Sequence, residues 1–492
     1  MAGLDCSKLV PSEWMLKNEG ACNIILSFCG PSCSPYYGHV LRLRKVSSSV
    51  QAADPRYGPL SLLPPELIPH PSTWADSSWT SFIFAKYIAG PSLGSSPVNG
   101  GTSYVDAGRV LALSSRFLER ISAQVFASRP EYRRKTALDC TAKFGLLLLD
   151  YTGPVHPSSP VLAVEIKPKW GFLPFSHADP ADMGPMDLVK ARVCRYCLHQ
   201  SHKRPPDAPR SRYCPLDLFS GDPLRIRSAL SALLADPQNN FRIYWQGRLR
   251  LGDPLSAEDH SWASCCSPPR LLDILQHALS IDPVLDRIRS LQLLDSLDIS
   301  RLYPLYCDDA PTPTPGSSVS HPFTLSSSLN PFRLSLSAPP ADFPLPPSAL
   351  FRDFLISTSF KDCSLMFTLS HPSPSLSPSP SSDPSLCNFL GLSLHVIDLD
   401  IRDASRIPDW WCLDHTIVNS YLESHSSPQQ HRSCSESATI SSQLPDDFAT
   451  EVDHPSIPSV DHPLITRPTR LASSCSDSRL PHASLSSEHL AL

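Results

Sequence analysis

The sequence has little glycine and no long hydrophobic run, and each shortage excludes a class of protein. Only 19 of the 492 residues are glycine, which excludes a collagen or a glycine-repeat protein. No apolar run approaches the roughly 20 residues that a membrane-spanning helix needs, and the run from Phe144 to Leu149 is typical of the longest. The first residues lack a charged segment followed by an apolar one, so we expect no signal peptide and no membrane partner.

The charge balance excludes a further class. Lysine and arginine number 42, aspartate and glutamate number 47, and the net charge is −5. A globally basic nucleic-acid-binding protein is therefore not expected, although a local basic patch remains open. The 16 cysteines are interpreted as reduced thiols rather than as a disulfide framework. We expect an intracellular protein of the nucleus, the cytoplasm or both.

Proline, with 53 residues, is about twice as frequent as in ordinary proteins. It gathers with serine in residues 308–348 and 370–388, and the polar residues 423–492 have a similar composition. Such segments bury too little apolar surface to offset the entropy of ordering, so we expect two disordered insertions and a disordered tail. The strand-like pieces at 351–369 and 392–400 are too short to fold alone and are expected to complete a core begun upstream.

Hydrophobic periodicity predicts a mixed α and β body. Strands are predicted at 40–45, 79–87, 145–150 and 161–166, the last two in a strand–turn–strand pattern. Helices are predicted at 106–126 with Asp106 as cap, at 222–234 with Asp222 as N-cap, at 270–297 with a break near Pro283, and at 410–422.

The first cluster of charged residues lies in Glu165-Ile166-Lys167-Pro168-Lys169. On an extended segment Glu165, Lys167 and Lys169 point to one face. Two ammonium groups with one carboxylate suit the binding of a phosphate. An exposed edge strand, on which lysine and proline prevent further pairing, is the alternative, and the charge pattern alone favours it.

A second cluster, residues 190–212, contains seven lysines or arginines against one acid. On a helix Arg195, His199 and Lys203 form one stripe, which would fit a small polyanion. A solvated basic face is the alternative. Zinc is a further one, since Cys194 and Cys197 are followed by His199, His202 and Cys214, although the spacing lacks a matching second pair of ligands.

Carboxylates and one glycine complete the candidate chemistry. Asp398 and Asp400 end an apolar run and Asp362 precedes another, and carboxylates in such places suit Mg²⁺ or the ordinary capping of turns. Gly20, before the apolar run 24–28, would let backbone N–H groups approach a phosphate, or make an ordinary turn. Neither a Walker A motif nor a protein-kinase GxGxxG motif is present.

Taken in order, these segments resemble the inositol-pentakisphosphate 2-kinase family. The Glu165 to Lys169 run followed by Gly171-Phe172 resembles the ExKPK signature of that family, and Glu13-Trp14 with Glu19 to Asn23 resembles its glycine-rich ATP loop. Lys17-Asn18 stand where that loop usually has Arg-Gly. Further blocks, among them Arg195 to Gln200, Pro215 to Gly221, Lys361 to Ser364 and Ile397 to Asp400, extend the resemblance from about residue 13 to 421.

The resemblance implies an α+β, two-lobed kinase-like fold with the ATP cleft between an N-lobe, residues 1–155, and a C-lobe, residues 156–422. It implies transfer of the ATP γ-phosphate to the 2-hydroxyl of inositol 1,3,4,5,6-pentakisphosphate, which gives inositol hexakisphosphate (phytate), with Mg²⁺ as cofactor and a monomeric enzyme. A non-catalytic scaffold that binds inositol polyphosphates is the main alternative. Another inositol polyphosphate kinase is disfavoured because the PxxxDxKxG block is absent, and a nucleic-acid-binding adaptor would use residues 190–212.

The resemblance also assigns roles to single residues. Asp362 is the implied base for the 2-hydroxyl, Lys167 contacts the transferring phosphate, and Asp398 is the Mg²⁺ ligand. The implied ATP-binding residues are Glu19, Gly20, Ala21, Cys22, Asn23, Arg42, Asp150, Glu165 and Arg242. The implied substrate-binding residues are Arg133 (with Arg134 as the alternative), Lys169, Arg195, His199, Lys203, Asn239, Arg402, Arg406 and Trp410. Plant members carry a structural zinc site ahead of the catalytic aspartate, and because no equivalent set lies between Cys307 and Asp362 we predict no zinc there.

Overall fold

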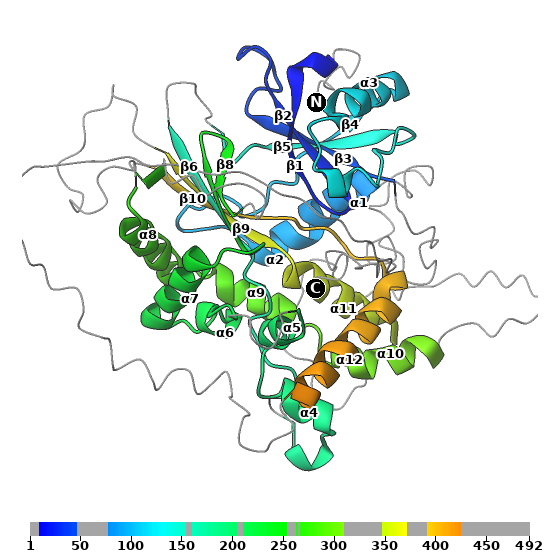
Figure 1. Cartoon of the computed structure of the whole chain (residues 1–492), viewed down its shortest axis with the longest axis vertical. Helices are drawn as coiled ribbons and strands as arrows, with labels where there is room; N and C mark the ends of the chain where they lie inside the picture. The colour runs from blue at the N-terminus through cyan, green and yellow to red at the C-terminus, as the bar shows by residue number, and fades with distance from the viewer. Residues whose placement is uncertain are drawn as a thin grey trace, which may run out of the picture.

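The computed structural model describes residues 9–46, 77–153, 160–176, 178–203, 210–252, 262–263, 266–308, 347–370 and 391–424. These residues form two five-stranded antiparallel sheets and a set of helices, an α+β arrangement. Figure 1 shows the first sheet with one helix at the top, the second sheet near the centre, and most helices below. The predicted insertions and tail lie almost wholly outside the described residues.

The first sheet has the strand order β1-β2-β3-β5-β4. Its strands are β1 (Trp14–Glu19), β2 (Asn23–Phe28), β3 (His39–Arg44), β4 (Arg109–Ala112) and β5 (Phe144–Leu149). Helix α3 (Ser115–Phe126) shares one hydrophobic core with this sheet through Phe117, Leu118 and Ile121. The strands predicted at 40–45 and 145–150 are confirmed.

The helix predicted over 106–126 is too long at its start. Residues 109–112 form β4, which pairs with β5, and α3 begins only after Ser114. The Ser114 hydroxyl accepts a hydrogen bond from the N–H of Phe117 at 3.2 Å, which is the normal N-cap interaction. Asp106 instead accepts the N–H groups of Gly108 and Leu149 and fixes the chain that leads into β4.

The second sheet has the order β10-β9-β6-β7-β8. Its strands are β6 (Val161–Ile166), β7 (Phe241–Trp245), β8 (Arg248–Leu251), β9 (Ser364–Ser370) and β10 (Gly391–Ile397). Strand β6 is central, and all six of its residues are buried. The edge-strand interpretation of Glu165 to Lys169 is therefore wrong. The strand–turn–strand prediction is half right, because β5 and β6 are both strands but belong to different sheets.

Helices pack against one face of the second sheet and form the large core with it (Figure 1). The longer ones are α5 (Arg195–Lys203), α7 (Pro223–Ala235), α8 (Pro268–Ile281), α9 (Val284–Gln292), α10 (Asp298–Asp308), α11 (Pro347–Lys361) and α12 (Ile407–Ser424), with short helices α4 (Pro185–Lys190) and α6 (Pro215–Leu218). The Asp222 cap of α7 and the break at Pro283 are confirmed. None of the described helices is long and apolar enough to span a membrane.

Two predicted strands are helices. Residues 79–87 lie in α1 (Ser77–Ile83) and a following π-helical turn (Phe84–Ala89), ahead of α2 (Gly90–Leu93). Residues 347–361 form α11, and only β9 is extended. In α11 Phe351, Phe354 and Leu355 share one face and pack together, at a helical spacing that the strand-like interpretation of this segment missed.

Candidate active site

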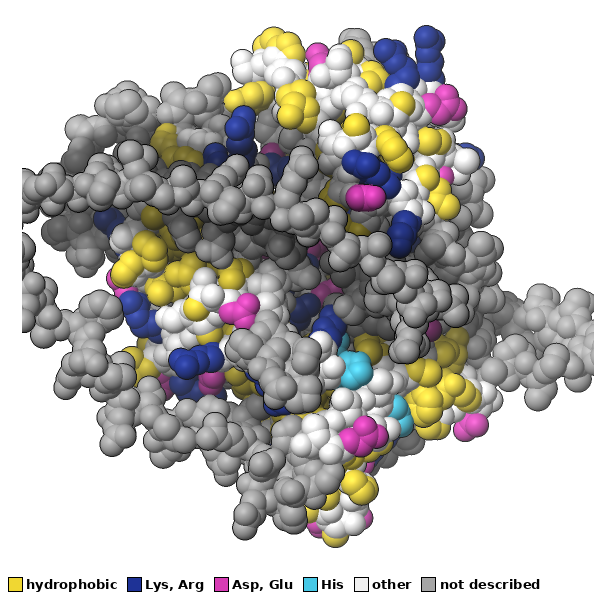
Figure 2. All heavy atoms as spheres, in the orientation of Figure 1, with side chains coloured by type: hydrophobic (Ala, Val, Ile, Leu, Met, Phe, Trp, Pro, Cys, Tyr) yellow, Lys and Arg dark blue, Asp and Glu magenta, His cyan; other side chains and the backbone are white. Residues whose placement is uncertain are grey.

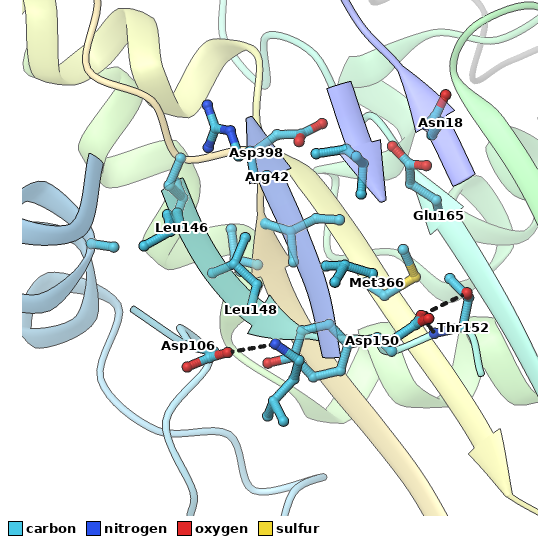
Figure 3. Close-up of a pocket in the computed structure, with 18 of the residues that line it drawn as sticks. Asn18, Arg42, Asp106, Leu146, Leu148, Asp150, Thr152, Glu165, Met366 and Asp398 are labelled. Atoms are coloured by element: carbon cyan, nitrogen blue, oxygen red, sulfur yellow. Dashed lines mark hydrogen bonds between the residues drawn. The ribbon is translucent and has the colours of Figure 1, made fainter. Parts of the chain in front are cut away.

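A cleft that is open to solvent lies between the two sheets. Apolar side chains of both sheets form its walls, with Ile25, Val40 and Leu148 on one side and Met366 and Val396 on the other. Figure 3 shows charged groups at the ends of this apolar slot, and an apolar slot with few polar groups is typical of a small-ligand site. The predicted residues Arg42, Asp150, Glu165, Arg242 and Asp398 all line it.

One end of the cleft is closed by an ion pair that the sequence did not predict. The Lys17 ammonium donates to both oxygens of Asp150, at 2.7 and 2.9 Å, and both side chains are nearly buried. Lys17 is the extra residue of a β-bulge in β1, which explains how a strand residue reaches the cleft. Thr152 donates its N–H and its hydroxyl to the same carboxylate (Figure 3). The bulge has no sequence signature, so only the position of Lys17 beside the loop motif hinted at its role.

Glu165 lies in the floor of the cleft on β6. Its carboxylate accepts hydrogen bonds from the Tyr244 hydroxyl at 3.1 Å, from Ser364 at 3.0 Å and from Arg242 at 3.4 Å. The negative charge of Glu165 raises the pKa of Arg242, and burial raises the pKa of Tyr244. Glu165 and Arg242 therefore lie side by side, as predicted. With Tyr244 and Ser364 they form a hydrogen-bonded polar group at the floor of the apolar slot.

The predicted glycine-rich loop connects β1 to β2. The N–H of Gly20 donates to the carbonyl of Asn23 at 2.9 Å, which closes a tight turn, and Ala21 and Cys22 are exposed. The amide of Asn23, oriented to satisfy its neighbours, accepts a hydrogen bond from Arg42 at 2.7 Å. Gly20, Ala21 and Cys22 do not line the cleft; the turn reaches it through Arg42, which does.

Glu19 does not reach this surface. Its side chain is 1% exposed, and it accepts hydrogen bonds from Arg129 at 2.7 and 2.8 Å and from Lys45 at 2.7 Å. Burial raises the pKa of Glu19, and the hydrogen bonds from Arg129 and Lys45 lower it by more than burial raises it. The assignment of Glu19 as an ATP-binding residue is therefore corrected. Glu19 is a buried residue that anchors the start of the loop through its ion pairs with Arg129 and Lys45.

This buried group leads to a prediction about stability. We expect Arg129→Met to lower the free energy of unfolding by about 3–5 kcal/mol, because the change leaves Glu19 buried with only one of its two cations. Urea unfolding followed by tryptophan fluorescence measures the loss. The matched control is Arg227→Met, which breaks an exposed pair with Asp273 and should cost at most about 1 kcal/mol. Equal losses in the two variants would contradict this account of Glu19.

Asp398 lies at the end of β10, where the second sheet meets the cleft. Its Oδ2 atom accepts hydrogen bonds from Lys167 at 2.9 Å and from Ser364 at 3.2 Å, and the side chain is 53% exposed. The partial enclosure of the carboxylate in the cleft raises its pKa, but the positive charges of Lys167 and Arg42 lower the pKa by more, so the carboxylate is ionised. No side chain of the described residues donates to Oδ1, which is available to a cation.

Asp362 faces a different pair of cations. Lys169 donates to its Oδ1 at 3.0 Å and Arg402 to its Oδ2 at 2.6 Å. Burial raises the pKa of Asp362, but the charges of Lys169, Arg402 and Lys167 hold it well below its usual range. Burial lowers the pKa of Lys167, but the negative charges of Asp398 and Asp362 raise it by more, so both predicted carboxylates act on this one lysine.

Asp400, which the sequence analysis grouped with Asp398, has different hydrogen-bond partners. It accepts hydrogen bonds from Arg42 and from the hydroxyl of Ser81, the latter at 2.9 Å. Burial raises its pKa, and Arg42 brings it down to about 2. Since Arg42 belongs to the first sheet and Asp400 follows the second, this ion pair joins the two sheets beside the cleft.

A group of cations extends from Asp362 along α5. Burial and the positive charges of Lys203, Arg195 and Lys169 together lower the pKa of His199 to about 3, so His199 lies among several cations. Figure 2 shows histidine side chains next to lysine and arginine side chains on this face of the molecule. Arg195 is mostly buried and also lies 3.4 Å from Asp414, so part of its charge is already neutralised.

The other predicted substrate residues are less closely grouped. Asn239 is exposed in the turn that precedes Asn240, whose carbonyl accepts the N–H of Lys167 at 2.9 Å. Arg406 pairs with Asp409 at 2.8 Å. Arg133 lies in a 3-10 turn (Glu131–Arg133), and the alternative Arg134 is engaged with the carbonyls of Ala127 and Arg129.

The assignment of Trp410 as a substrate-binding residue is corrected. Its side chain belongs to a hydrophobic core and is 7% exposed, and its ring lies 5.8 Å from that of Phe354. It therefore packs α12 against α11 and has little surface left for a ligand.

Comparisons with known proteins agree over nearly the whole body of the chain. The family model described as inositol-pentakisphosphate 2-kinase matches residues 17–416. The inositol-pentakisphosphate 2-kinase of Arabidopsis thaliana is 28% identical over 453 residues, which cover 83% of this chain and 93% of that protein. The enzyme of the same name from Danio rerio is 27% identical over 515 residues (86% and 96%), and that from Cryptococcus neoformans var. neoformans is 29% identical over 441 residues (84% and 94%).

Phosphoryl transfer depends on positioning and on neutralising phosphate charge, and an apolar slot bordered by lysine, arginine and strand-end carboxylates has groups suited to both. The chain belongs to the inositol-pentakisphosphate 2-kinase family, because the family model covers well over half of its length. As a kinase of this family it uses ATP as its co-substrate.

Proposed function

We propose that this protein transfers the γ-phosphate of ATP to the 2-hydroxyl of inositol 1,3,4,5,6-pentakisphosphate and releases inositol hexakisphosphate. The observation that carries the proposal is the carboxylate of Asp362 held between Lys169 and Arg402, next to the cations of α5. A substrate with five phosphates needs many cations, and this net-acidic chain concentrates them beside the carboxylate of Asp362.

ATP is proposed to lie with its base and sugar between the apolar walls and its phosphates toward Arg42 and Lys167. Asp398 fits a Mg²⁺ ligand, because its exposed carboxylate lies at the cleft with one oxygen available and hard cations prefer oxygen ligands. When bound, Mg²⁺ would neutralise charge on the phosphates. Lys167, already ion-paired to Asp398, is placed to contact the transferring phosphate.

Asp362 is proposed to be the base that accepts the proton of the 2-hydroxyl. In the free protein its pKa is low, which makes it a weak base. The cations responsible, Lys169 and Arg402, are those proposed to bind substrate phosphates. Substrate binding would divide their charge between the phosphates and the carboxylate, and the pKa of Asp362 would rise toward a useful value.

The remaining parts of the proposal concern the whole chain. We propose that the two sheets form the two lobes of a kinase-like fold, residues 1–155 and 156–422, with ATP between them. We further propose a monomer located in the nucleus, the cytoplasm or both. A non-catalytic scaffold is the second candidate, but the carboxylates of Asp362 and Asp398 would repel the phosphates of an inositide in a protein that only binds it.

A turnover assay tests the activity directly. Purified protein is incubated with Mg-ATP and inositol pentakisphosphate, and the products are separated by anion-exchange chromatography. Formation of hexakisphosphate supports the proposal. Binding of pentakisphosphate without product would favour the scaffold, and the absence of both would overturn the proposed function.

Lys203 provides a separate test of substrate binding. It lies at the exposed end of α5, and its charge is proposed to act on the substrate before and during transfer alike. We expect Lys203→Ala to raise KM for the inositide about tenfold, the effect of about 1.4 kcal/mol, with kcat almost unchanged. Steady-state kinetics at saturating ATP measure both constants. A large fall in kcat at unchanged KM would contradict the assignment.

A further inference from the structure

Three cysteine thiols gather outside the cleft, at the start of α5. The sulfur atoms of Cys194, Cys197 and Cys214 lie within 4.8 Å of one another. Cys194 and Cys214 are buried, and Cys197 is partly exposed. Within the described ranges these thiols are the one group of three or more cysteine, histidine or acidic side chains close enough to share a metal ion.

The spacing of the sulfur atoms suits a metal ion. Zn–S bonds of about 2.3 Å place two thiolates of a tetrahedral site about 3.8 Å apart, and Cys194 and Cys214 are 3.8 Å apart at sulfur. The N–H of Cys197 donates to the Cys194 sulfur at 3.5 Å, a hydrogen bond that would stabilise a metal-bound thiolate. Thiolates are soft ligands and favour zinc over the hard cations.

We propose that Cys194, Cys197 and Cys214 bind one zinc ion, with a water molecule at the partly exposed side as the fourth ligand. The structure selects three of the five ligands that the sequence spacing suggested. His199 and His202 are not part of the group, and His199 faces Lys203, Arg195 and Lys169 instead. The site is distinct from any set between Cys307 and Asp362, most of which lies outside the described residues.

The ion would join two segments that carry the proposed substrate residues. Cys194 precedes Arg195 directly, and Cys214 follows Tyr213, whose hydroxyl donates to the carbonyl of Pro168 at 2.8 Å, between Lys167 and Lys169. The rings of Tyr196 and Tyr213 are in edge contact, 5.2 Å apart. Zinc would therefore fix the start of α5 to the lysine-bearing segment. This role in substrate binding rests on the proposed function, whereas the metal site itself does not.

Metal content tests the site without reference to activity. Full-length protein, purified under reducing conditions without chelator, should contain about one zinc per chain by inductively coupled plasma mass spectrometry. Cys194→Ser and Cys197→Ser should retain less than about a tenth of that content. Cys412→Ser, at an exposed thiol on α12, is the matched control and should keep it. Because the buried variant can fail to fold, the partly exposed Cys197→Ser keeps the test decisive.

Cobalt gives a second measurement on the wild-type chain. Protein stripped of metal and titrated with Co²⁺ should develop a thiolate-to-cobalt charge-transfer band that saturates at about one equivalent. Wild-type protein without zinc and without this band would overturn the proposal. So would a Cys194–Cys214 disulfide found by peptide mass spectrometry, which would make the pair a redox element. Zinc bound by a chain that makes no hexakisphosphate would refute the proposed function and leave the metal site intact.

Discussion

Replacing Asp398 by asparagine is expected to lower kcat by about 10³-fold or more, because a carboxylate that binds a cation beside transferring phosphate is replaced by a neutral amide. Asparagine is the appropriate substitute on structural grounds. The backbone of Asp398 is left-handed, with φ of 60°, and asparagine tolerates this conformation better than alanine does. The variant should therefore fold normally, and its defect should report the charge alone.

The measurement is single-turnover conversion of pentakisphosphate with saturating Mg-ATP. Asp273→Asn, a change of the same chemistry at an exposed position on α8, is the control and should retain full activity. Wild-type and variant should show the same unfolding midpoint. Retention of more than about a tenth of the wild-type rate by Asp398→Asn would remove this residue from the catalytic site.

Asp362→Asn is expected to lower kcat by about 10²–10⁴-fold, the usual contribution of a general base. Its effect on binding should have the opposite sign. Lys169 and Arg402 lose their carboxylate partner, and their charge becomes fully available to substrate phosphates. The dissociation constant of pentakisphosphate should thus stay constant or fall while turnover collapses.

Isothermal titration with pentakisphosphate and steady-state kinetics separate the two effects. The comparison with Lys203→Ala is informative, because that variant should bind less tightly and turn over normally once saturated. A loss of binding in Asp362→Asn would mean that the carboxylate organises the cation site structurally. An unchanged kcat would mean that another group takes the proton.

Much of the site was predictable because its residues lie in short, ordered motifs. The segment from Glu165 to Lys169, the pair Asp362 and Asp398, and the stripe on α5 were all identified before the structure, and the structure brings them together. The sequence could not show in which direction each of these side chains points. Glu19 lies in the loop motif and was therefore predicted to bind ATP. Its side chain instead points into the core, where Arg129 and Lys45 donate hydrogen bonds to its carboxylate.

The errors in the fold have a common physical origin. Aromatic and β-branched residues are frequent around Trp79 and again from Phe351 to Phe360, and such residues suit a strand locally. Both segments are nevertheless helices buried on several faces. Tertiary burial removes the alternation that a sequence pattern depends on. The basic run after β6 shows the reverse error, since proline and lysine suggested an exposed edge and the strand proved to be central.

The ion pair between Arg42 and Asp400 joins positions 358 residues apart, and Asp398 lies beside it. During synthesis the first sheet and most of the second can therefore emerge from the ribosome well before the carboxylates that complete the cleft. A chain that ends between β9 and β10 would carry most of the cleft and many of the cations, but neither Val396 of the cleft wall nor the acid at position 398. Such a fragment could hold phosphates without transferring them, so this order of elements ties catalytic competence to nearly complete translation of the folded body.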